Sequence, residues 1–265
     1  MGRILAITNQ KGGVGKTTSS VNLAASLAAS GKKVLLLDLD PQGNATMGSG
    51  VNKHELKKSI YHVLTGKHDI KDTICRGLDG GYDLLPSNAD LTAAEVELMQ
   101  MDNKEFILKK ELKKVLDQYD FTLIDCPPSL NMLTVNAVVA ASSVIIPMQC
   151  EYYALEGLTA LMDTITGIRN TINPGLRIEG LLRTMYDPRA SLTTEVSKQL
   201  ISHFGDQVYK TVIPRNIRLA EAPSHGMPVL AYDKHSRGAI AYLALAGELL
   251  RKHELEKTEN KTGVC

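Results

Sequence analysis

A glycine-rich stretch near the start of the sequence places the strongest constraint on the fold. It occupies residues 11–18, between an apolar run that predicts a strand at 2–8 and a stretch that predicts a helix at about 16–30. Glycines let backbone N–H groups approach phosphate oxygens closely, and the amino end of a helix favours anions. The sequence therefore predicts a phosphate-binding loop between a strand and a helix. The residues expected to bind a nucleotide there are Lys11, Gly12, Gly13, Val14, Gly15, Lys16, Thr17 and Thr18.

Apolar runs and helix-like stretches alternate along the rest of the chain. Runs such as 34–37 are apolar at every position, which is typical of parallel strands covered on both faces. We therefore predict an α/β fold with a mostly parallel sheet flanked by helices on both faces. Residues 1–253 are expected to form a single domain, and the charged segment 254–265 a disordered tail. Further strands are predicted at 33–38, 82–86, 121–125, 144–147, 178–185 and 208–213, and helices at 104–118, 129–141, 155–172, 193–204 and 238–253.

Composition narrows the class of protein. The 265 residues are 43% hydrophobic and 22% charged, with a net charge of +1, which argues against disorder. No apolar run reaches the roughly 18 residues that a membrane span needs. The sequence opens without a signal-peptide pattern, and its four cysteines are scattered, so we expect a cytoplasmic protein with reduced thiols. A net charge of +1 gives little overall attraction for a polyanion.

Carboxylates follow two of the predicted strands, where they can act beside the loop. Lys16 can reach the β- and γ-phosphates of a bound nucleotide, and Thr17 can ligate Mg²⁺. Asp125 ends an apolar strand, which is the arrangement that binds Mg²⁺ through water in proteins with this kind of loop. Asp38 and Asp40 follow the second strand, where a carboxylate can orient water near the γ-phosphate. Alternatively, Asp38 and Asp40 cap the turn or the helix that follows.

The loop departs from the usual phosphate-loop pattern in one respect. Gln10 stands where the pattern has glycine, and Lys11 stands at the front of the loop instead. This deviant Walker A loop, together with the segments 38–44, 125–130 and 213–224, resembles the ParA/Soj and MinD group of ATPases. The resemblance extends from residue 4 to about residue 250.

The resemblance implies roles for several residues. Lys11 would cross a dimer interface to the nucleotide of the partner subunit. Asp40 would position or activate the attacking water, and Asp38 would lie near the metal. Pro214 and Asn216 would contact the adenine base, the asparagine through its amide and the proline by packing. The expected ligands are therefore ATP and Mg²⁺.

The same resemblance implies a partition ATPase that works on DNA. Mg²⁺-ATP would drive homodimerisation and binding to non-specific double-stranded DNA, and a ParB-type partner would stimulate hydrolysis and release. Arg189 and Arg218 match arginines implicated in DNA binding in Soj-type proteins. Residues 176–252 carry a net charge of +4 and the remainder −3, so the total hides an asymmetry. An ordinary solvated basic surface is the competing interpretation. The expected location is the cytoplasm, in association with the nucleoid.

Three other functions are possible for a chain with this loop. The main alternative is a MinD-like ATPase that cycles on membranes, but the segment 251–261 has one leucine and no apolar face, which disfavours membrane binding. A metabolic enzyme on the same scaffold would need a second substrate motif, which we did not find. An iron–sulfur carrier would use cysteines, yet Cys126 and Cys150 are better interpreted as small buried residues.

Overall fold

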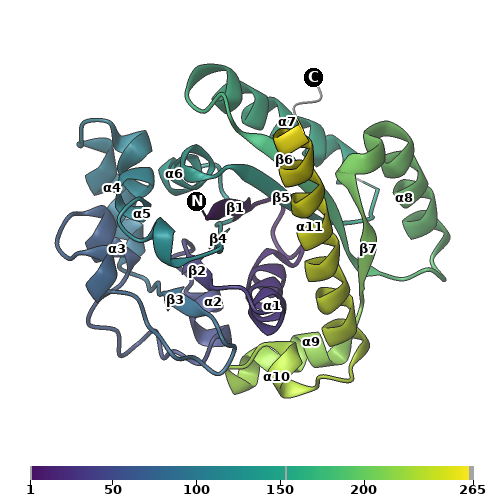
Figure 1. Cartoon of the computed structure of the whole chain (residues 1–265), viewed down its shortest axis with the longest axis horizontal. Helices are drawn as coiled ribbons and strands as arrows, with labels where there is room; N and C mark the ends of the chain where they lie inside the picture. Colours follow the sequence, from purple (N-terminus) through teal and green to yellow (C-terminus); the bar gives the residue numbers. More distant parts are fainter. Residues whose placement is uncertain (1, 153, 263–265) are drawn as a thin grey trace.

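The computed structural model describes residues 2–152 and 154–262, and this part of the chain contains one sheet of seven parallel strands (Figure 1). The strand order is β3-β2-β4-β1-β5-β6-β7. The predicted α/β class is confirmed, and each predicted strand is present with ends that differ by at most two residues. The strands are β1 (Arg3–Ile7), β2 (Val34–Asp38), β3 (Asp83–Leu85), β4 (Phe121–Asp125), β5 (Ser143–Gln149), β6 (Arg177–Tyr186) and β7 (Val208–Pro214).

Helices cover both faces of the sheet. Figure 1 shows α1 and α11 on one side and α6 and α7 on the other. The α-helices are α1 (Lys16–Ala29), α2 (Asn44–Gly48), α3 (Ile60–Leu64), α4 (Leu91–Met99), α5 (Ile107–Leu112), α6 (Met132–Ala140), α7 (Ala154–Thr171), α8 (Ser191–Phe204), α9 (Ile217–Glu221), α10 (Val229–Tyr232) and α11 (Arg237–Thr262). Short 3₁₀ turns are η1 (Ile70–Asp72), η2 (Lys104–Phe106), η3 (Leu116–Gln118), η4 (Gly205–Gln207) and η5 (Ala222–His225).

The core lies on both faces because successive side chains of a strand point to opposite sides. In β2, Leu35 and Leu37 join the cluster that packs under α3 to α8, whereas Val34 and Leu36 join the cluster under α1 and α11. All four side chains are buried. The continuous apolar run at 34–37 therefore reflects a strand covered on both faces, as predicted from the sequence.

Several helical regions differ from the prediction. The predicted helix at 104–118 is divided into η2, α5 and η3. Asn136 of α6 explains part of the break, because its side chain accepts a hydrogen bond from the N–H of Leu108 and donates one to the carbonyl oxygen of Lys104. These groups at the start of α5 are therefore satisfied from another element. Helix α4 was not predicted.

Helix α11 runs to Thr262 and so continues beyond the predicted end at residue 253. Tertiary contacts explain the extension. His253 Nε2 lies 3.1 Å from Glu179 Oε1 on β6, and both side chains are buried. One turn later, Glu256 pairs with Arg3 at 2.5 Å. These contacts hold the charged part of α11 against the amino ends of β6 and β1. The division into one domain and a tail stays a prediction, and residues 263–265 lie outside the described part.

The edge strand β7 is irregular where it pairs with β6, and two charged side chains satisfy its backbone. Arg183 of β6 donates to the carbonyl oxygen of Tyr209 at 2.8 Å and to Ser197 Oγ at 2.8 Å. From α11, Glu248 accepts the N–H groups of Lys210 and Thr211 at 2.7 and 2.9 Å. The buried arginine and the glutamate therefore replace part of the regular strand pairing.

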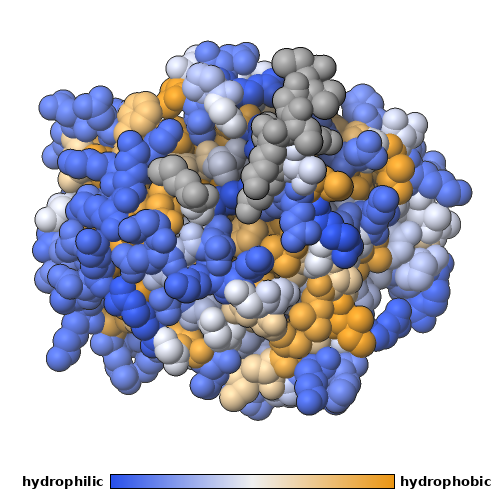
Figure 2. Space-filling model, viewed as in Figure 1, coloured by the Kyte–Doolittle hydropathy of each residue, from blue (hydrophilic) through white to orange (hydrophobic). Residues whose placement is uncertain are grey.

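The surface is mostly polar on the face in Figure 2, with an apolar area where α11 begins. Ile240 and Leu243 are exposed in this part of α11. Among the described residues, no helix combines the length and apolar character needed to cross a bilayer.

Candidate nucleotide and magnesium site

The predicted site residues meet at the carboxyl edge of the sheet. Strands β2, β4 and β1 are neighbours, and Asp125 pairs in register with Asp38 on one side and Ile7 on the other. The glycine-rich loop leaves the end of β1 and enters α1 at Lys16. Because parallel strands end at a common edge, the loop and the two carboxylates lie beside one another.

The loop combines left-handed glycines with open space at the start of α1. Gly13 and Gly15 have positive φ angles of 71° and 84°, and Gly15 caps the amino end of α1. A side chain added at Gly12 or Gly13 would meet nothing within 4 Å, so open space faces this part of the loop. Thr184 of β6 holds the loop at Val14, because its hydroxyl donates a hydrogen bond to the carbonyl oxygen of Val14 at 2.8 Å. The loop can therefore admit an anion in front of the helix terminus.

Lys16 extends back across the loop and is largely buried. Its Nζ donates a hydrogen bond to the carbonyl oxygen of Lys11 at 3.1 Å. Burial lowers the pKa of Lys16 below its usual value, and the nearby carboxylates of Asp125 and Asp40 act against this change. The lysine is therefore held between the phosphate loop and two carboxylates.

Asp125 has one oxygen engaged and one free. Ser20 of α1 donates to its Oδ1 at 2.8 Å, whereas Oδ2 is buried without a hydrogen-bond partner in the described part of the chain. Burial, followed by the charge of Asp38, raises the pKa of Asp125 to about 8, and the neighbouring hydroxyls of Thr17 and Ser20 oppose the rise. A buried carboxylate oxygen without a donor is a position that a cation can occupy.

The site fits Mg²⁺ better than a metal held entirely by protein. Among the described residues, no three His, Cys, Asp or Glu side chains form a group that could hold a metal ion. Magnesium is usually bound by one or two protein ligands together with substrate phosphates and water. The hydroxyl of Thr17 and the free oxygen of Asp125 suit that mode of binding.

Asp38 is fully buried, and both of its carboxylate oxygens already accept hydrogen bonds. Oδ2 accepts from the backbone and the hydroxyl of Thr46 at 2.8 and 2.7 Å, and Oδ1 accepts from the N–H of Asp40 at 3.2 Å. Burial raises the pKa of Asp38 to about 6, although these hydrogen bonds oppose the rise. The side chain lies next to Asp125, and its hydrogen bonds hold the loop that follows β2 in place.

Asp40 lies at the start of that loop. Its Oδ1 accepts from the N–H of Gln42 at 2.9 Å, and the side chain is about nine-tenths buried. The negative charge of Asp40 also opposes the lowering of the Lys16 pKa. Asp40 therefore caps the turn, which is the alternative role that the sequence suggested. This hydrogen bond uses Oδ1 and does not involve Oδ2.

Lys11 is at the mouth of the loop and is partly exposed. Its Nζ lies 2.7 Å from Glu151 Oε2, and both side chains are 45% exposed. Asn9 supports the backbone here by accepting the N–H of Lys11 at 3.0 Å. In the isolated chain this lysine therefore pairs with a glutamate that follows β5.

Two cavities flank the loop. The first has a volume of about 240 Å³ and lies beside Gly15, Tyr242, Pro214 and Asn216. Asn216 Oδ1 caps α9 by accepting the N–H groups of Arg218 and Leu219, so its amide N–H₂ remains the group available to a ligand. The second cavity has a volume of about 400 Å³ and adjoins Thr17 and the α2 helix.

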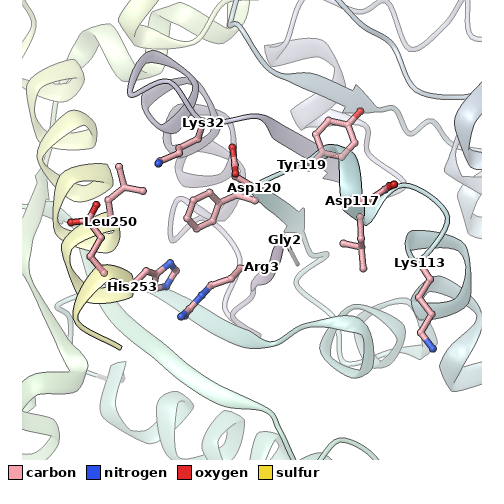
Figure 3. A pocket seen from close by; sticks show the side chains of 12 residues that line it. Gly2, Arg3, Lys32, Lys113, Asp117, Tyr119, Asp120, Leu250 and His253 are labelled. Carbon is pink, nitrogen blue, oxygen red and sulfur yellow. The ribbon is translucent and has the colours of Figure 1, made fainter. Parts of the chain in front are cut away.

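A third cavity, of about 500 Å³, lies at the opposite edge of the sheet (Figure 3). Arg3 and Asp120 line it at the amino ends of β1 and β4, together with Lys32 and His253. Its lining mixes cations and carboxylates, and the phosphate loop is at the other edge. This cavity is therefore separate from the candidate nucleotide site.

The two arginines predicted to bind DNA are exposed and paired within the chain. Arg189 makes two hydrogen bonds to Asp187, each 2.9 Å long, and its side chain is 89% exposed. Arg218 contacts Glu221 at 2.8 Å and Asp233 at 3.4 Å. Exposed ion pairs contribute little to stability, so a phosphate could replace the carboxylates.

The prediction from the sequence missed several residues that shape the site. Ser20 lies four positions after Lys16, so helical spacing could have identified it on the same face as the loop lysine. Thr184 and Ser87 come from distant segments and are marked by no local pattern; the hydroxyl of Ser87 donates a hydrogen bond to the carbonyl oxygen of Asp40. Cys126 is buried, and burial raises the pKa of its thiol well above the usual range.

Comparisons with known sequences identify relatives that are named as chromosome-partitioning proteins. A family model described as an AAA domain (AAA_31) matches residues 2–178. The sporulation initiation inhibitor protein Soj of Bacillus subtilis is 52% identical over 94% of this chain and 98% of its own length. The chromosome partitioning protein ParA of Caulobacter vibrioides is 49% identical over 94% of each chain.

Solved structures with the same fold include nucleotide complexes. A cobyrinic acid a,c-diamide synthase of Mycobacterium smegmatis, with bound ATP analog and magnesium, has a TM-score of 0.85 and 37% identity, and 96% of each chain is covered. The cell division ATPase MinD of Pyrococcus furiosus has a TM-score of 0.77 and 27% identity, covering 95% of this chain and 99% of that one.

Proposed function

Because the chain belongs to the ParA/Soj family of chromosome-partitioning ATPases, we propose that it is an ATP-dependent DNA segregation ATPase. ATP binding would produce a homodimer that holds non-specific DNA, and hydrolysis would release it. One observation carries most of this proposal. In the described part of the chain, Asp125 keeps a buried oxygen without a hydrogen-bond partner beside the open phosphate loop, and the charges of Asp125 and Asp40 both act to raise the pKa of Lys16.

Nucleotide binding is assigned to residues 11–18. The backbone of the loop and Lys16 would hold the phosphates, and Pro214 and Asn216 would contact the base from the 240 Å³ cavity. Thr17 and Asp125 would hold Mg²⁺, with Asp38 beside them. When bound, the metal supplies positive charge against the phosphate oxygens.

Hydrolysis is assigned to Asp40 and the two lysines. Asp40 would orient the attacking water, because it follows β2 at the edge of the sheet where the phosphate loop lies and its charge acts on Lys16. We expect Asp40→Ala to leave an ATP-bound dimer that binds DNA but hydrolyses ATP slowly. Single-turnover hydrolysis measures this directly, and a normal rate would remove Asp40 from the reaction.

Dimerisation is assigned to Lys11. To reach the nucleotide of a partner subunit, Lys11 must leave Glu151, and an exposed ion pair presents only a small barrier to that change. ATP would then favour the dimer because a second cation meets its phosphates there. Linkage requires that ATP bind the dimer more tightly than the monomer.

DNA binding is assigned to Arg189 and Arg218. A dimer carries each arginine twice on one rigid body, so affinity can rise steeply when ATP drives association. A ParB-type protein would stimulate hydrolysis and so release the dimer from the nucleoid. We place the protein in the cytoplasm, in association with DNA and without a membrane partner.

An ATP-dependent DNA mobility-shift assay tests the proposal. The wild type should shift DNA with Mg²⁺-ATP and not with ADP. Arg218→Glu should lose the shift but keep ATP-dependent dimerisation, whereas Arg169→Glu on α7 makes the same charge change on another exposed residue and should retain it. For each phosphate contact that is lost, the slope of log K for DNA binding against log salt concentration should become less steep by about 0.9.

A liposome sedimentation assay distinguishes the DNA-binding function proposed here from membrane binding, the main alternative. The solved MinD structure favours keeping a MinD-like membrane-cycling ATPase as the second candidate. ATP-dependent sedimentation with anionic vesicles, without any DNA shift, would support that function and overturn ours. Unchanged ATP affinity in Lys16→Ala would contradict the nucleotide site itself.

A further inference from the structure

We propose that Thr46 and Ser87 are positioning residues that hold the loop carrying Asp40 in the geometry needed for ATP hydrolysis. The inference rests on the proposed function, in which Asp40 acts on the attacking water. Neither residue contacts the loop of residues 11–18 through any hydrogen bond in the described part of the chain. They would act only through Asp38 and Asp40.

Thr46 is the centre of the network. Its hydroxyl donates to Asp38 Oδ2 at 2.7 Å, and its backbone N–H donates to the same oxygen at 2.8 Å. The hydroxyl oxygen also accepts the backbone N–H of Ser87 at 2.9 Å. A hydroxyl can donate once and accept at the same time, so Thr46 uses both capacities to join β2, α2 and the segment after β3.

Ser87 completes the network at Asp40. Its hydroxyl donates to the carbonyl oxygen of Asp40 at 2.9 Å, and the N–H of Gly43 donates to the same carbonyl at 2.9 Å. The N–H of Asp40 donates to Asp38 at 3.2 Å. The backbone of Asp40 is thus held at both its N–H and its carbonyl oxygen, which leaves the direction of its side chain well defined.

Burial makes these hydrogen bonds effective. Asp38, Thr46 and Ser87 are fully buried, so water cannot readily replace a lost partner. The backbone segments also approach closely, because a Cβ atom at Gly43 would lie only 2.8 Å from the carbonyl oxygen of Ser87. The loop between Asp40 and Gly43 therefore rests directly on the Ser87 segment and has little room to shift.

This arrangement predicts an effect on the rate of hydrolysis that is separate from nucleotide binding. Binding depends mainly on the loop at 11–18, including Lys16 and Thr17, and on Asp125, none of which these hydrogen bonds contact. The attacking water depends on the position of Asp40, and misplacement of a catalytic group by about 1 Å can lower a rate by roughly 100-fold. A purely structural role would instead lower stability and nucleotide affinity together.

The test compares matched variants of the full chain. Thr46→Val keeps the shape and the backbone N–H but removes the hydroxyl, whereas Thr46→Ser keeps the hydroxyl. Ser87→Ala removes the second hydroxyl at another position. Single-turnover hydrolysis, the Kd for a fluorescent ATP analogue with Mg²⁺, and thermal melting are measured for each variant.

We expect Thr46→Val and Ser87→Ala to hydrolyse ATP about 10- to 100-fold more slowly, with Kd changed by less than about threefold. Thr46→Ser should stay within about threefold of the wild-type rate. A wild-type rate in folded Thr46→Val and Ser87→Ala would overturn the inference, and so would losses of rate that match losses of affinity. If the wild type itself does not hydrolyse ATP, the proposed function fails instead.

Discussion

Gly43→Ala tests how closely the loop after β2 depends on the segment after β3. Gly43 has a φ of +59°, and a Cβ atom built on it would lie 2.8 Å from the carbonyl oxygen of Ser87. The same Cβ would lie 2.9 Å from Cδ of Lys53, but that side chain is flexible and can move. The backbone oxygen of Ser87 cannot move without disturbing Asp40, which Ser87 also holds.

The expected destabilisation has two parts. A left-handed backbone costs a non-glycine residue about 1–2 kcal/mol. Overpacking against a fixed atom typically costs a further ~1–3 kcal/mol. The free energy of unfolding should therefore fall by about 2–5 kcal/mol, and a domain of this size loses roughly 2–4 °C of melting temperature per kcal/mol.

Gly31→Ala is the matched control. Gly31 also has a positive φ, +77°, but a side chain there would meet nothing within 4 Å. This variant should show only the backbone cost of about 1–2 kcal/mol. Urea unfolding of both variants measures the difference, which isolates the contact with Ser87.

The two variants should also differ in activity. Gly43→Ala should slow single-turnover ATP hydrolysis, because the loop that carries Asp40 has to move away from Ser87. Gly31→Ala, at the far end of α1, should hydrolyse ATP like the wild type. If the two variants unfold within about 0.5 kcal/mol of each other, the close approach does not constrain the loop and the reasoning is wrong.

Four further predictions follow from the contacts described above. Lys16→Ala should abolish binding of Mg²⁺-ATP in a fluorescence titration while the protein stays folded. Glu151→Gln releases Lys11 and should raise the ATP-dependent dimer fraction by less than about fivefold in light scattering, because an exposed pair contributes up to ~1 kcal/mol. Arg183→Met should lower the free energy of unfolding by about 3 kcal/mol or more, since buried carbonyl groups of β7 lose their donor. Burial tends to raise the pKa of Glu179, but hydrogen bonds and nearby charges outweigh it and hold the pKa below the usual value. That stabilisation is present above the unfolded pKa of about 4.3 and is lost as the pH falls. In Glu179→Gln, the urea concentration at the midpoint of unfolding should therefore fall less steeply as the pH is lowered through this range.

The sequence predicted the sheet and the loop well because their signals are local. An apolar run that is buried on both faces, followed by glycines and a lysine, specifies a strand, a turn and a helix within about 30 residues. Asp125 could be recognised in the same way, because a carboxylate at the end of an apolar strand lies at the edge where the loop is. The predicted helix at 104–118 was less accurate, since the break depends on Asn136 from another element.

The assignments of Asp38 and Asn216 show where local reasoning stops. Both were predicted at ligand sites, and in addition both use side-chain oxygens to hold backbone N–H groups, at Thr46 and at the start of α9, which leaves the amide N–H₂ of Asn216 for the predicted base contact. Whether a polar atom is free for a ligand depends on its neighbours in space. For Asp125 the neighbouring donor Ser20 engages one oxygen and leaves the other free.

By itself, the sequence determined that this chain has a parallel α/β fold with a phosphate loop, and that carboxylates end two of its strands. Those features follow from hydrophobic periodicity and from the backbone freedom of glycine, which act over a few residues. Only the tertiary structure decided that β2 and β4 are neighbours, that Ser87 supports Asp40 from a segment 47 positions away, and that Lys11 pairs with Glu151. These contacts depend on the order of strands in the sheet, which is set by the packing of the whole chain.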